Sequence, residues 1–327
     1  MKTNSKIRVG IVGGAGYTGG EVLRLLLNHP SAAIQFVHSR SKAGLLLSEV
    51  HTDLIGDTDL RFTDTLTDTI DVLFLCLGDG SSQKLINELD LEKSVKIIDL
   101  SQDFRLHSTN STSFVYGLPE LNRTAIKNAQ NIANPGCFAT AIQLALLPLA
   151  AQQLMNSDVH VSCTTGSTGA GQSMRAYSHF SWRQNNLSLY KAFTHQHLQE
   201  INQSLRQLQQ SISAEIVMIP QRGSFTRGIF ASLVMKSDKG LEALQKMYTD
   251  YYTGHPFVHL STNSIDLKQV VNTNKCLLYL EKHGDELLIV SVLDNLLKGA
   301  AGQAVQNMNL LFGLAETAGL KLKASAF

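Results

Sequence analysis

Cysteine is scarce in this chain of 327 residues, and its placement argues against the usual uses of clustered thiols. The four cysteines stand far apart and form no Cys-x-x-Cys pair: Cys76, Cys137, Cys163 and Cys276. A disulfide framework and a structural zinc site both need closer spacing, so we expect no metal. The pattern is still compatible with one reactive thiol.

Long apolar runs are also absent. The longest, residues 139–151, contains Gln143 and Pro148 and is shorter than the roughly 20 residues that a helix needs to cross a bilayer. The first apolar run follows a polar N-terminal stretch and is interrupted by glycines from Gly10 onward, so it makes a poor signal-peptide core. We therefore expect no membrane partner and a cytoplasmic location.

The charge has no excess of one sign. Lysine and arginine number 28, aspartate and glutamate 27, and the formal net charge is +1. That balance argues against a nucleic-acid partner. Hydrophobic residues make up 43% and charged residues 17%, which is typical of a packed globular protein, and the length suits two domains.

What the N-terminal part does contain is an alternation of apolar runs and helical stretches. Continuous apolar runs at residues 7–12, 34–39, 71–77 and 95–100 predict buried strands, and residues 19–28 predict a helix. Such runs are typical of a parallel sheet covered on both faces, so we predict a Rossmann-type α/β domain.

The C-terminal part has a different pattern. A predicted helix at residues 137–154 precedes predicted strands at 159–163, 216–219 and 228–235 and a hairpin that turns near Gly284. Strands with few helices between them predict an α+β domain with a largely antiparallel sheet. We expect the last helix, residues 295–311, to return to the first domain. The predicted domains are therefore residues 1–136 with 295–327, and residues 137–294.

A glycine-rich loop follows the first predicted strand. Gly13, Gly16 and Gly19 form Gly-x-x-Gly-x-x-Gly between a strand and a helix. Without side chains there, the backbone can approach a pyrophosphate, and the helix N-terminus offers free N–H groups and a positive dipole end. We expect this loop, with Tyr17 and Thr18, to bind a dinucleotide; the alternative is a tight structural turn.

An acidic residue is missing where NAD-binding folds usually carry one. The second predicted strand leads into Ser39, Arg40 and Ser41, and the first carboxylate after it is Glu49. A carboxylate there would repel a 2′-phosphate, whereas these three residues could hold one. We predict NADP(H) as the cofactor; the alternative is that Arg40 is a solvated loop charge.

Two cysteines compete for the role of nucleophile. Cys163 lies in Ser-Cys-Thr-Thr, similar to the nucleophile motif of glyceraldehyde-3-phosphate dehydrogenases, but Gly166 follows and we expect Cys163 to end a strand. Cys137 follows Asn-Pro-Gly and opens a strongly helical stretch, where the helix dipole favours the thiolate. Cys76 and Cys276 lie in apolar runs and are predicted to be core residues. We predict Cys137 as the nucleophile.

Ordered motifs extend over nearly the whole chain. They lie at residues 13–21, 99–105, 116–120, 134–137, 166–171, 195–197, 226–229 and 294–299, and include Asn134-Pro-Gly-Cys137 and Asp294-Asn-Leu-Leu-Lys-Gly299. Together they resemble the N-acetyl-gamma-glutamyl-phosphate reductase family of arginine biosynthesis. The resemblance implies a semialdehyde dehydrogenase-like architecture, a small-molecule substrate and a homodimer or homotetramer.

The resemblance also implies a mechanism. In this family the cysteine of Asn-Pro-Gly-Cys is the nucleophile and the first histidine of His-x-His the acid/base, which map to Cys137 and His195. The implied reaction is NADPH-dependent reduction of an N-acyl-L-glutamyl 5-phosphate, through a Cys137 thioester, to the 5-semialdehyde and phosphate. Thr194 as an N-cap would place His195 in the first turn of a helix, whose dipole disfavours imidazolium.

Further motif residues extend the predicted site. We expect Ser167, Gly169, Asn295 and Lys298 to contact the cofactor. Candidates for binding the substrate are Arg105, Asn134, Gln221, Arg222 and Arg227. For the charged residues the alternative is a surface charge or a helix cap.

One departure from the family pattern stands out. Many relatives carry Pro-His before the Arg-Gly-Ile segment, whereas this chain has Pro220, Gln221 and Arg222. We expect that position to line the substrate pocket, where Arg222 could meet a carboxylate on a larger acyl group such as succinyl. The motifs are also compatible with an aspartate-semialdehyde dehydrogenase, which they fit less well, and with a catalytically silent NADP-binding protein.

Overall fold

The computed structural model describes residues 6–67, 69–89, 92–106 and 114–326, and the chain divides into two compact units. Unit 1 comprises Met1–Pro135 and Ala300–Lys321, and unit 2 comprises Gly136–Gly299 and Leu322–Phe327. Among the described residues, no helix combines the length and the apolar character that crossing a bilayer requires.

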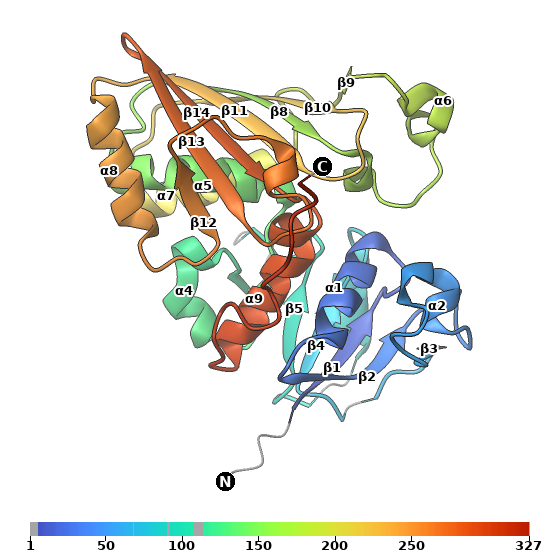
Figure 1. Ribbon diagram of the computed structural model, residues 1–327. Helices are drawn as coiled ribbons and strands as arrows, with labels where there is room; N and C mark the ends of the chain where they lie inside the picture. The colour runs from blue at the N-terminus through green and yellow to red at the C-terminus, as the bar shows by residue number, and fades with distance from the viewer. Residues whose placement is uncertain (1–5, 68, 90–91, 107–113, 327) are drawn as a thin grey trace. The chain divides into compact units, whose positions relative to one another are not determined.

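Unit 1 is built on a parallel sheet of seven strands in the order β3-β2-β1-β4-β5-β7-β6 (Figure 1). Every strand pair in it is parallel, which confirms the predicted Rossmann-type sheet. The strands are β1 Ile7–Val12, β2 Ala32–His38, β3 Phe62–Thr63, β4 Val72–Leu75, β5 Lys96–Asp99, β6 Phe114–Tyr116 and β7 Asn131–Ala133.

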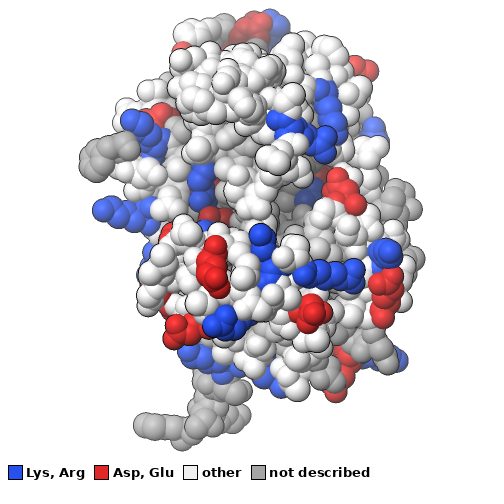
Figure 2. Space-filling model, turned by 90° about the vertical axis from the view of Figure 1, so that its right-hand side faces the viewer, with Lys and Arg blue, Asp and Glu red and all other residues white. Residues whose placement is uncertain are grey.

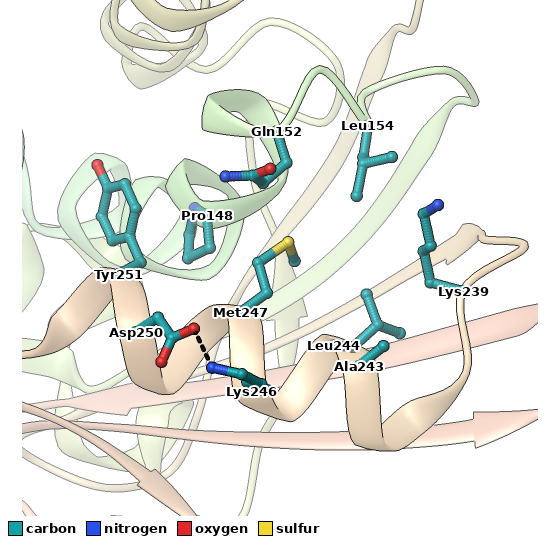
Figure 3. Close-up of a pocket in the computed structure, with 10 residues that line it drawn as sticks. All are labelled: Pro148, Gln152, Leu154, Lys239, Ala243, Leu244, Lys246, Met247, Asp250 and Tyr251. Carbon is teal, nitrogen blue, oxygen red and sulfur yellow. Dashed lines mark hydrogen bonds and ion pairs between the residues drawn. The ribbon is translucent and has the colours of Figure 1, made fainter.

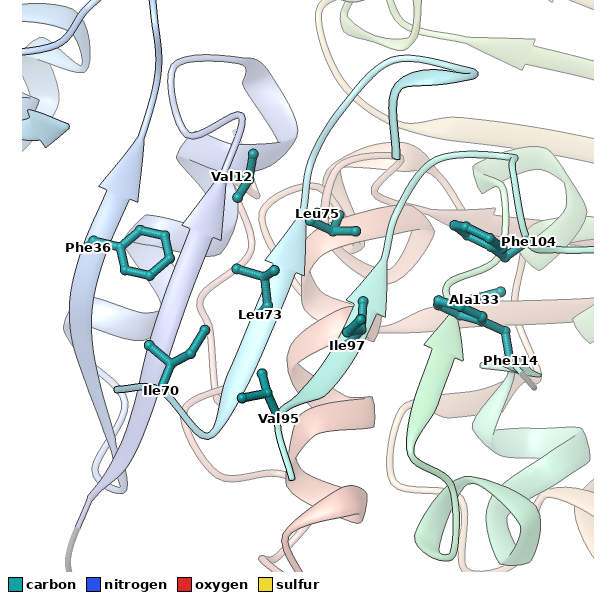
Figure 4. Close-up of a cluster of buried hydrophobic side chains, with 10 residues drawn as sticks. All are labelled: Val12, Phe36, Ile70, Leu73, Leu75, Val95, Ile97, Phe104, Phe114 and Ala133. Carbon is teal, nitrogen blue, oxygen red and sulfur yellow. The ribbon is translucent and has the colours of Figure 1, made fainter. Parts of the chain in front are cut away.

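Helices cover this sheet and close its core. They are α1 Tyr17–Leu27, α2 Leu47–Val50, α3 Ser81–Glu88, α4 Pro119–Lys127 and α9 Gly302–Leu311. The C-terminal α9 contacts α1, α4 and β5. Figure 4 shows part of the core, where side chains from neighbouring strands meet and Phe104 stacks on Phe114 with ring centroids 4.1 Å apart.

Unit 2 contains a second sheet, in the order β12-β13-β14-β11-β8-β10-β9. The β12–β13 and β8–β10 pairs are parallel and the other pairs antiparallel, so the sheet is largely antiparallel as predicted. Gly284, at φ 58°, lies in the turn of the predicted hairpin. The strands are β8 Val159–Thr165, β9 Ser188–Leu189, β10 Ile216–Arg222, β11 Ile229–Lys236, β12 Val258–Ser261, β13 Cys276–His283 and β14 Glu286–Leu293.

Helices α5 Cys137–Ala151, α7 His197–Leu208 and α8 Leu241–Tyr252 lie on one side of this sheet (Figure 1), and the short α6 Phe180–Arg183 lies beside β9. Helix α5 is buried on all sides from Phe138 to Ala150. Pro148 within it cannot donate to the carbonyl of Leu144, four residues earlier. The hydroxyl of Tyr252 donates to that carbonyl instead, so an apolar helix with an internal proline keeps its buried carbonyl bonded.

The predicted last helix begins later than residue 295. Residues Leu297–Ala301 form a π-helical turn before α9. Its cause is local: the N–H of Gly299 donates to the carbonyl of Asp294, five residues back, at 2.9 Å. The carboxylate of Asp294 meanwhile accepts the N–H groups of Leu296 and Leu297. An aspartate that takes neighbouring N–H groups delays the regular helix.

Candidate active site

The glycine loop in unit 1 has two kinds of glycine. Gly13 has φ 80°, and a Cβ on it would lie 2.3 Å from the carbonyl oxygen of Cys76. A Cβ on Gly19 would lie 2.4 Å from the carbonyl oxygen of Gly13. The turn itself therefore requires these two glycines.

Gly16 is different, because the turn does not require it. A Cβ there would meet only the carbonyl oxygen of Gly13, at 3.6 Å. Gly16 is the N-cap of α1, which begins at Tyr17 and has no acidic residue in its first turn. The glycine thus leaves a helix N-terminus uncovered by its own side chain, which is an environment that fits a pyrophosphate.

The residues after β2 carry no carboxylate. Ser39 is buried, and its N–H donates to the carbonyl of Thr63 at 2.9 Å, whereas Arg40 and Ser41 are exposed. The carboxylate of Glu49 accepts the N–H of Leu46, at the start of the short helix α2 to which Glu49 belongs. An exposed cation in a segment without a carboxylate is the environment expected for a 2′-phosphate. On the face that Figure 2 shows, basic and acidic side chains are otherwise interspersed.

Cys137 is the first residue of α5, in unit 2. It is half-buried, its N-cap is Gly136, and the first turn of α5 contains no acidic side chain. The helix dipole and the first-turn N–H groups therefore favour the thiolate at this position.

Cys163 is the poorer candidate. It lies within β8, as a strand residue rather than a helix cap, and is fully buried. Burial raises the pKa of the Cys163 thiol, and the neighbouring Cys137 raises it further. The two sulfurs are therefore within electrostatic reach of each other.

His195 lies outside the helix in which it was expected. Helix α7 begins at His197 with Gln196 as its N-cap, so the prediction that Thr194 caps the helix is wrong. The reason is that Nδ1 of His195 itself accepts the N–H of His197, at 3.2 Å, and so satisfies the start of the helix. As an acceptor, Nδ1 carries no hydrogen, which leaves the proton of the neutral ring on Nε2.

Burial sets the charge of His195. Its ring is 5% exposed and packs edge-on against Phe138 and Tyr190, with centroids 5.5 and 5.7 Å apart. Desolvation, followed by the neighbouring His197, lowers the pKa of His195 to about 3. The imidazole is therefore neutral near pH 7, because of burial rather than the helix dipole.

The backbone around the nucleophile is held on two sides. On one side, the N–H of Gly136 donates to the carboxylate of Glu200 at 2.9 Å, and a Cβ on Gly136 would lie 2.3 Å from Nε2 of His197. On the other side, a Cβ on Gly299 would lie 2.9 Å from the Cβ of Cys137. Because neither glycine has a side chain, His197 packs closely against Gly136 and Cys137 packs closely against Gly299. These contacts hold the backbone of Cys137 in position.

The motif that ends at Gly299 is anchored by Asp294. This buried carboxylate accepts Nε and Nη2 of Arg227 at 3.0 and 3.2 Å, and the N–H of Asn272 at 2.7 Å. Asn295 accepts the N–H of Gly228 at 2.7 Å. Arg227 and Asn295, predicted to bind substrate and cofactor, thus have partners within unit 2.

The four residues of unit 2 that were predicted to contact the cofactor lie in two segments of that unit. Lys298 is fully buried, 6.0 Å from the ring centroid of Phe257. Asn295 donates to Thr168, next to Ser167 and the exposed Gly169 in a short 3-10 turn, so the glycine loop at residues 166–171 is tied to the motif at residues 294–299. In unit 2 these segments are brought together, whereas their contact with a cofactor stays a prediction.

Arg105 and Asn134 belong to unit 1 and are buried there. Arg105 donates to the carbonyls of Asn134 and Leu100, both at 2.9 Å. The Asn134 side chain donates to the carbonyl of Ala300 and accepts from Asn307, at 3.0 and 3.1 Å. The structure therefore gives both residues a bonding role inside unit 1, and their contact with substrate stays a prediction.

Gln221 and Arg222 point to opposite faces of the sheet. Gln221 pairs with Thr164 and accepts its hydroxyl at 3.0 Å, on the face away from α5. Arg222 pairs with Thr165, on the buried face that also carries Cys163. The two residues therefore do not share a face of the sheet, because adjacent strand residues alternate, and the contact of either with substrate stays a prediction.

Aromatic residues around this site were not expected from the sequence. The Arg222 guanidinium lies 3.7 Å from the ring centroid of Tyr190 and 4.4 Å from that of Tyr177. Tyr177 lies in a short 3-10 turn and Tyr190 directly after the two-residue strand β9, and no periodicity of the sequence singles them out. Glu200 was not expected either, although its spacing from His197, three residues on one helix, could have indicated a pair.

A separate pocket of about 680 Å³ lies where α5 ends against α8 (Figure 3). Met247 and Tyr251 line it together with Pro148, and Lys246 pairs with Asp250 at its edge at 2.7 Å. Pro148 is eleven residues from Cys137, or roughly 16 Å along the helix, so this pocket is distinct from the surroundings of Cys137.

Comparison with known proteins gives consistent matches over both units. Residues 8–129 match the model of the semialdehyde dehydrogenase NAD binding domain, and residues 137–295 match that of the semialdehyde dehydrogenase dimerisation domain. N-acetyl-gamma-glutamyl-phosphate reductases from Phocaeicola vulgatus and Bacteroides thetaiotaomicron are each 59% identical to the chain over 322 residues. The relative of the same name from Flavobacterium johnsoniae is 55% identical over 324 residues. In each case 98% of this chain and 100% of the relative are covered.

Solved structures share the fold at low sequence identity. Aspartate semialdehyde dehydrogenase II of Vibrio cholerae, complexed with ASA, has a TM-score of 0.74 at 17% identity, covering 94% of this chain and 99% of that one. The Candida albicans enzyme with NADP has a TM-score of 0.66 at 14% identity, with the same coverage. These likenesses confirm the semialdehyde dehydrogenase-like architecture.

Proposed function

The chain belongs to the N-acetyl-gamma-glutamyl-phosphate reductase family, and from that premise we propose that it reduces an N-acyl-L-glutamyl 5-phosphate to the 5-semialdehyde and phosphate, a step of arginine biosynthesis. The observation that carries the proposal is the half-buried Cys137 at the start of α5, with the neutral imidazole of His195 packed beside the next residue, Phe138.

We assign NADP(H) binding to unit 1. The uncovered α1 N-terminus at Gly16 fits the pyrophosphate, and the exposed Arg40 with Ser39 and Ser41 fits the 2′-phosphate. When bound, NADPH supplies the hydride that reduces the acyl carbon. All catalytic side chains that we assign lie in unit 2.

Cys137 performs the first half of the reaction. Its thiolate forms a bond to C5 of the substrate while the bond from C5 to the phosphate oxygen breaks, and the phosphate leaves with the electron pair. The product of this step is a thioester on Cys137. The single proton that the overall reaction consumes goes to the departing phosphate.

His195 acts in the second half as a neutral donor. Addition of hydride to C5 leaves a negatively charged oxygen on that carbon, and Nε2–H of His195 donates a hydrogen bond to it. The carbonyl then re-forms, the bond from C5 to sulfur breaks, and Cys137 returns to the thiolate. Because His195 is neutral and its Nδ1 is occupied by His197, it needs no change of protonation in this cycle.

The match of residues 137–295 to a dimerisation domain supports a homo-oligomer, and we propose a homodimer or homotetramer in the cytoplasm. The test of the activity is phosphate-dependent reduction of NADP⁺ with N-acetylglutamate 5-semialdehyde, compared with aspartate semialdehyde. Turnover of the former supports the proposal. Turnover of aspartate semialdehyde alone supports the shorter substrate instead, and turnover of neither indicates a silent NADP-binding protein.

A further inference from the structure

Arg222 is a half-buried cation held by aromatic rings rather than by an acid. Its guanidinium lies 3.7 Å from the ring centroid of Tyr190 and 4.4 Å from that of Tyr177. Stacking on a ring occupies the face of a guanidinium and leaves the N–H groups at its edge able to donate. In the part of the chain that the structure describes, no hydrogen bond or ion pair engages those N–H groups.

Two other arginines of low exposure, Arg227 and Arg105, donate to groups of the protein itself. Arg227 uses Nε and Nη2 on Asp294, and Arg105 donates to two backbone carbonyls. Arg183 donates to the carbonyl of Arg222 itself, at 3.1 Å, and so holds its backbone in place. Nε and Nη1 of Arg183 are buried without a partner, but its Nη2 is held by backbone carbonyls, whereas none of the side-chain N–H groups of Arg222 is held by a described residue.

Arg222 also lies close to the reacting groups. It belongs to the buried face of β10, opposite Thr165, in the sheet whose strands β11, β13 and β14 contact α5, the helix that begins at Cys137. Tyr190 connects the two: burial raises the pKa of its phenol, the charge of Cys137 raises it further, and Arg222 lowers it. Arg222 and Cys137 therefore both lie within electrostatic reach of Tyr190.

We propose that Arg222 binds a carboxylate of the N-acylglutamyl substrate through the free edge of its guanidinium. This inference rests on the proposed function. A guanidinium edge matches a carboxylate with two parallel hydrogen bonds, and the tyrosine rings beside it offer apolar contact to methylene groups. Two carboxylates fit this chemistry, namely the α-carboxylate of the glutamyl moiety and the terminal carboxylate of a dicarboxylic acyl group such as succinyl.

The experiment measures steady-state kinetics of the full chain in the oxidative direction, with N-acetyl- and N-succinylglutamate 5-semialdehyde, phosphate and NADP⁺. Arg222→Met removes the positive charge and keeps a side chain of similar length. Arg222→Lys keeps the charge but lacks the two parallel N–H donors of the guanidinium. Arg206→Met, at an exposed position near the end of α7, is the matched control. We expect Arg222→Met to raise the KM for the semialdehyde roughly 10- to 100-fold with little change in kcat, and Arg222→Lys to restore part of the loss.

The outcomes separate the sources of the carboxylate. A rise in KM with both semialdehydes assigns the α-carboxylate, and a rise with the succinylated one alone assigns the acyl terminus. An unchanged KM for both, or a rise confined to the KM for phosphate, overturns the subsite while leaving the proposed function intact. If the unaltered protein turns over neither semialdehyde, the proposed function fails and the subsite with it. Arg222→Lys decides the question if Arg222→Met does not fold.

Discussion

The N–H of Gly136 donates to the buried carboxylate of Glu200 at 2.9 Å, so the residue before the nucleophile is tied to the first turn of α7. This bond joins the start of α5, where Cys137 lies, to α7, which begins two residues after His195. It also places a carboxylate near the start of α5, where negative charge competes with the Cys137 thiolate.

Substitutions at Glu200 should separate these two effects. Glu200→Gln keeps an acceptor for the Gly136 N–H and removes the charge, so we expect the thiol of Cys137 to ionise at lower pH and kcat to stay within a few-fold. Glu200→Leu removes both and should lower kcat roughly 10- to 100-fold. The pH dependence of iodoacetamide alkylation checks the first effect. An unaltered alkylation profile in Glu200→Gln would show that the carboxylate does not act on the thiol.

Only one cysteine should be needed for turnover. Cys137→Ser should abolish it while NADP⁺ binding, measured by fluorescence titration, is retained, because the residues assigned to the pyrophosphate and the 2′-phosphate lie in unit 1. Cys163→Ala is the control: it removes a buried thiol of raised pKa and should leave most of the activity. Loss of activity in Cys163→Ala with the protein still folded would transfer the role to Cys163.

Ionisation of His195 should not make kcat depend on pH between pH 5 and 8. Its pKa is lowered to about 3 by burial, so the ring is already neutral throughout that range. His195→Asn should cost roughly 10²- to 10³-fold in kcat at every pH in this range, the usual effect of losing one donor to an oxyanion. A profile that loses an ionisation near pH 6.5 on substitution would contradict the assignment of a neutral donor.

The same shift predicts how stability depends on pH. The unfolded chain binds a proton at His195 below about pH 6.5, whereas the folded chain binds it only near pH 3. Between these values folding excludes a proton, so stability is lost as pH falls, by at most about 1.4 kcal/mol per pH unit from this group. His195→Asn should therefore flatten the rise of Tm from pH 4.5 to 6.5, as measured by calorimetry. An equally steep rise would show that other groups cause it.

Gly299 should tolerate no side chain. A Cβ there would lie 2.9 Å from the Cβ of Cys137 and 3.2 Å from the carbonyl of Asp294, so Gly299→Ala must displace the nucleophile. We expect kcat to fall roughly 10- to 100-fold with the fold retained. Gly240→Ala is the matched control, because nothing lies within 4 Å of a Cβ there and φ is −67°. Equal kcat in the two variants would show that the close approach at Gly299 does not position the thiol.

The regular elements could be predicted because their patterns are local. The continuous apolar run of residues 7–12 is β1, and the hairpin turns at Gly284 as expected. The start of α7 could not be predicted in this way, since it depends on Nδ1 of His195 accepting the N–H of His197, and Thr194 looks equally suitable as a cap.

The residues of the candidate site could be predicted where a local sequence motif indicates them, but not where they come together only through tertiary contacts. Cys137 and the glycine loop follow from local helix-terminus physics. The opposite directions of Gln221 and Arg222 follow from strand alternation, but only once residues 216–222 are known to extend the strand beyond residue 219. Tyr177 and Tyr190 meet Arg222 through segments for which the sequence offers no periodic signal.

The return of α9 to unit 1 has a consequence for biosynthesis of the chain. Helix α9, which lies beyond residue 300, contacts α1 and α4, and its Asn307 donates to the carbonyl of Gly117 at 2.9 Å. On a ribosome that emits the chain from its N-terminus, the whole of residues 136–299 emerges before the nucleotide-binding unit receives its last helix. The nascent first unit must therefore wait for a segment made more than 160 residues later before these contacts can form.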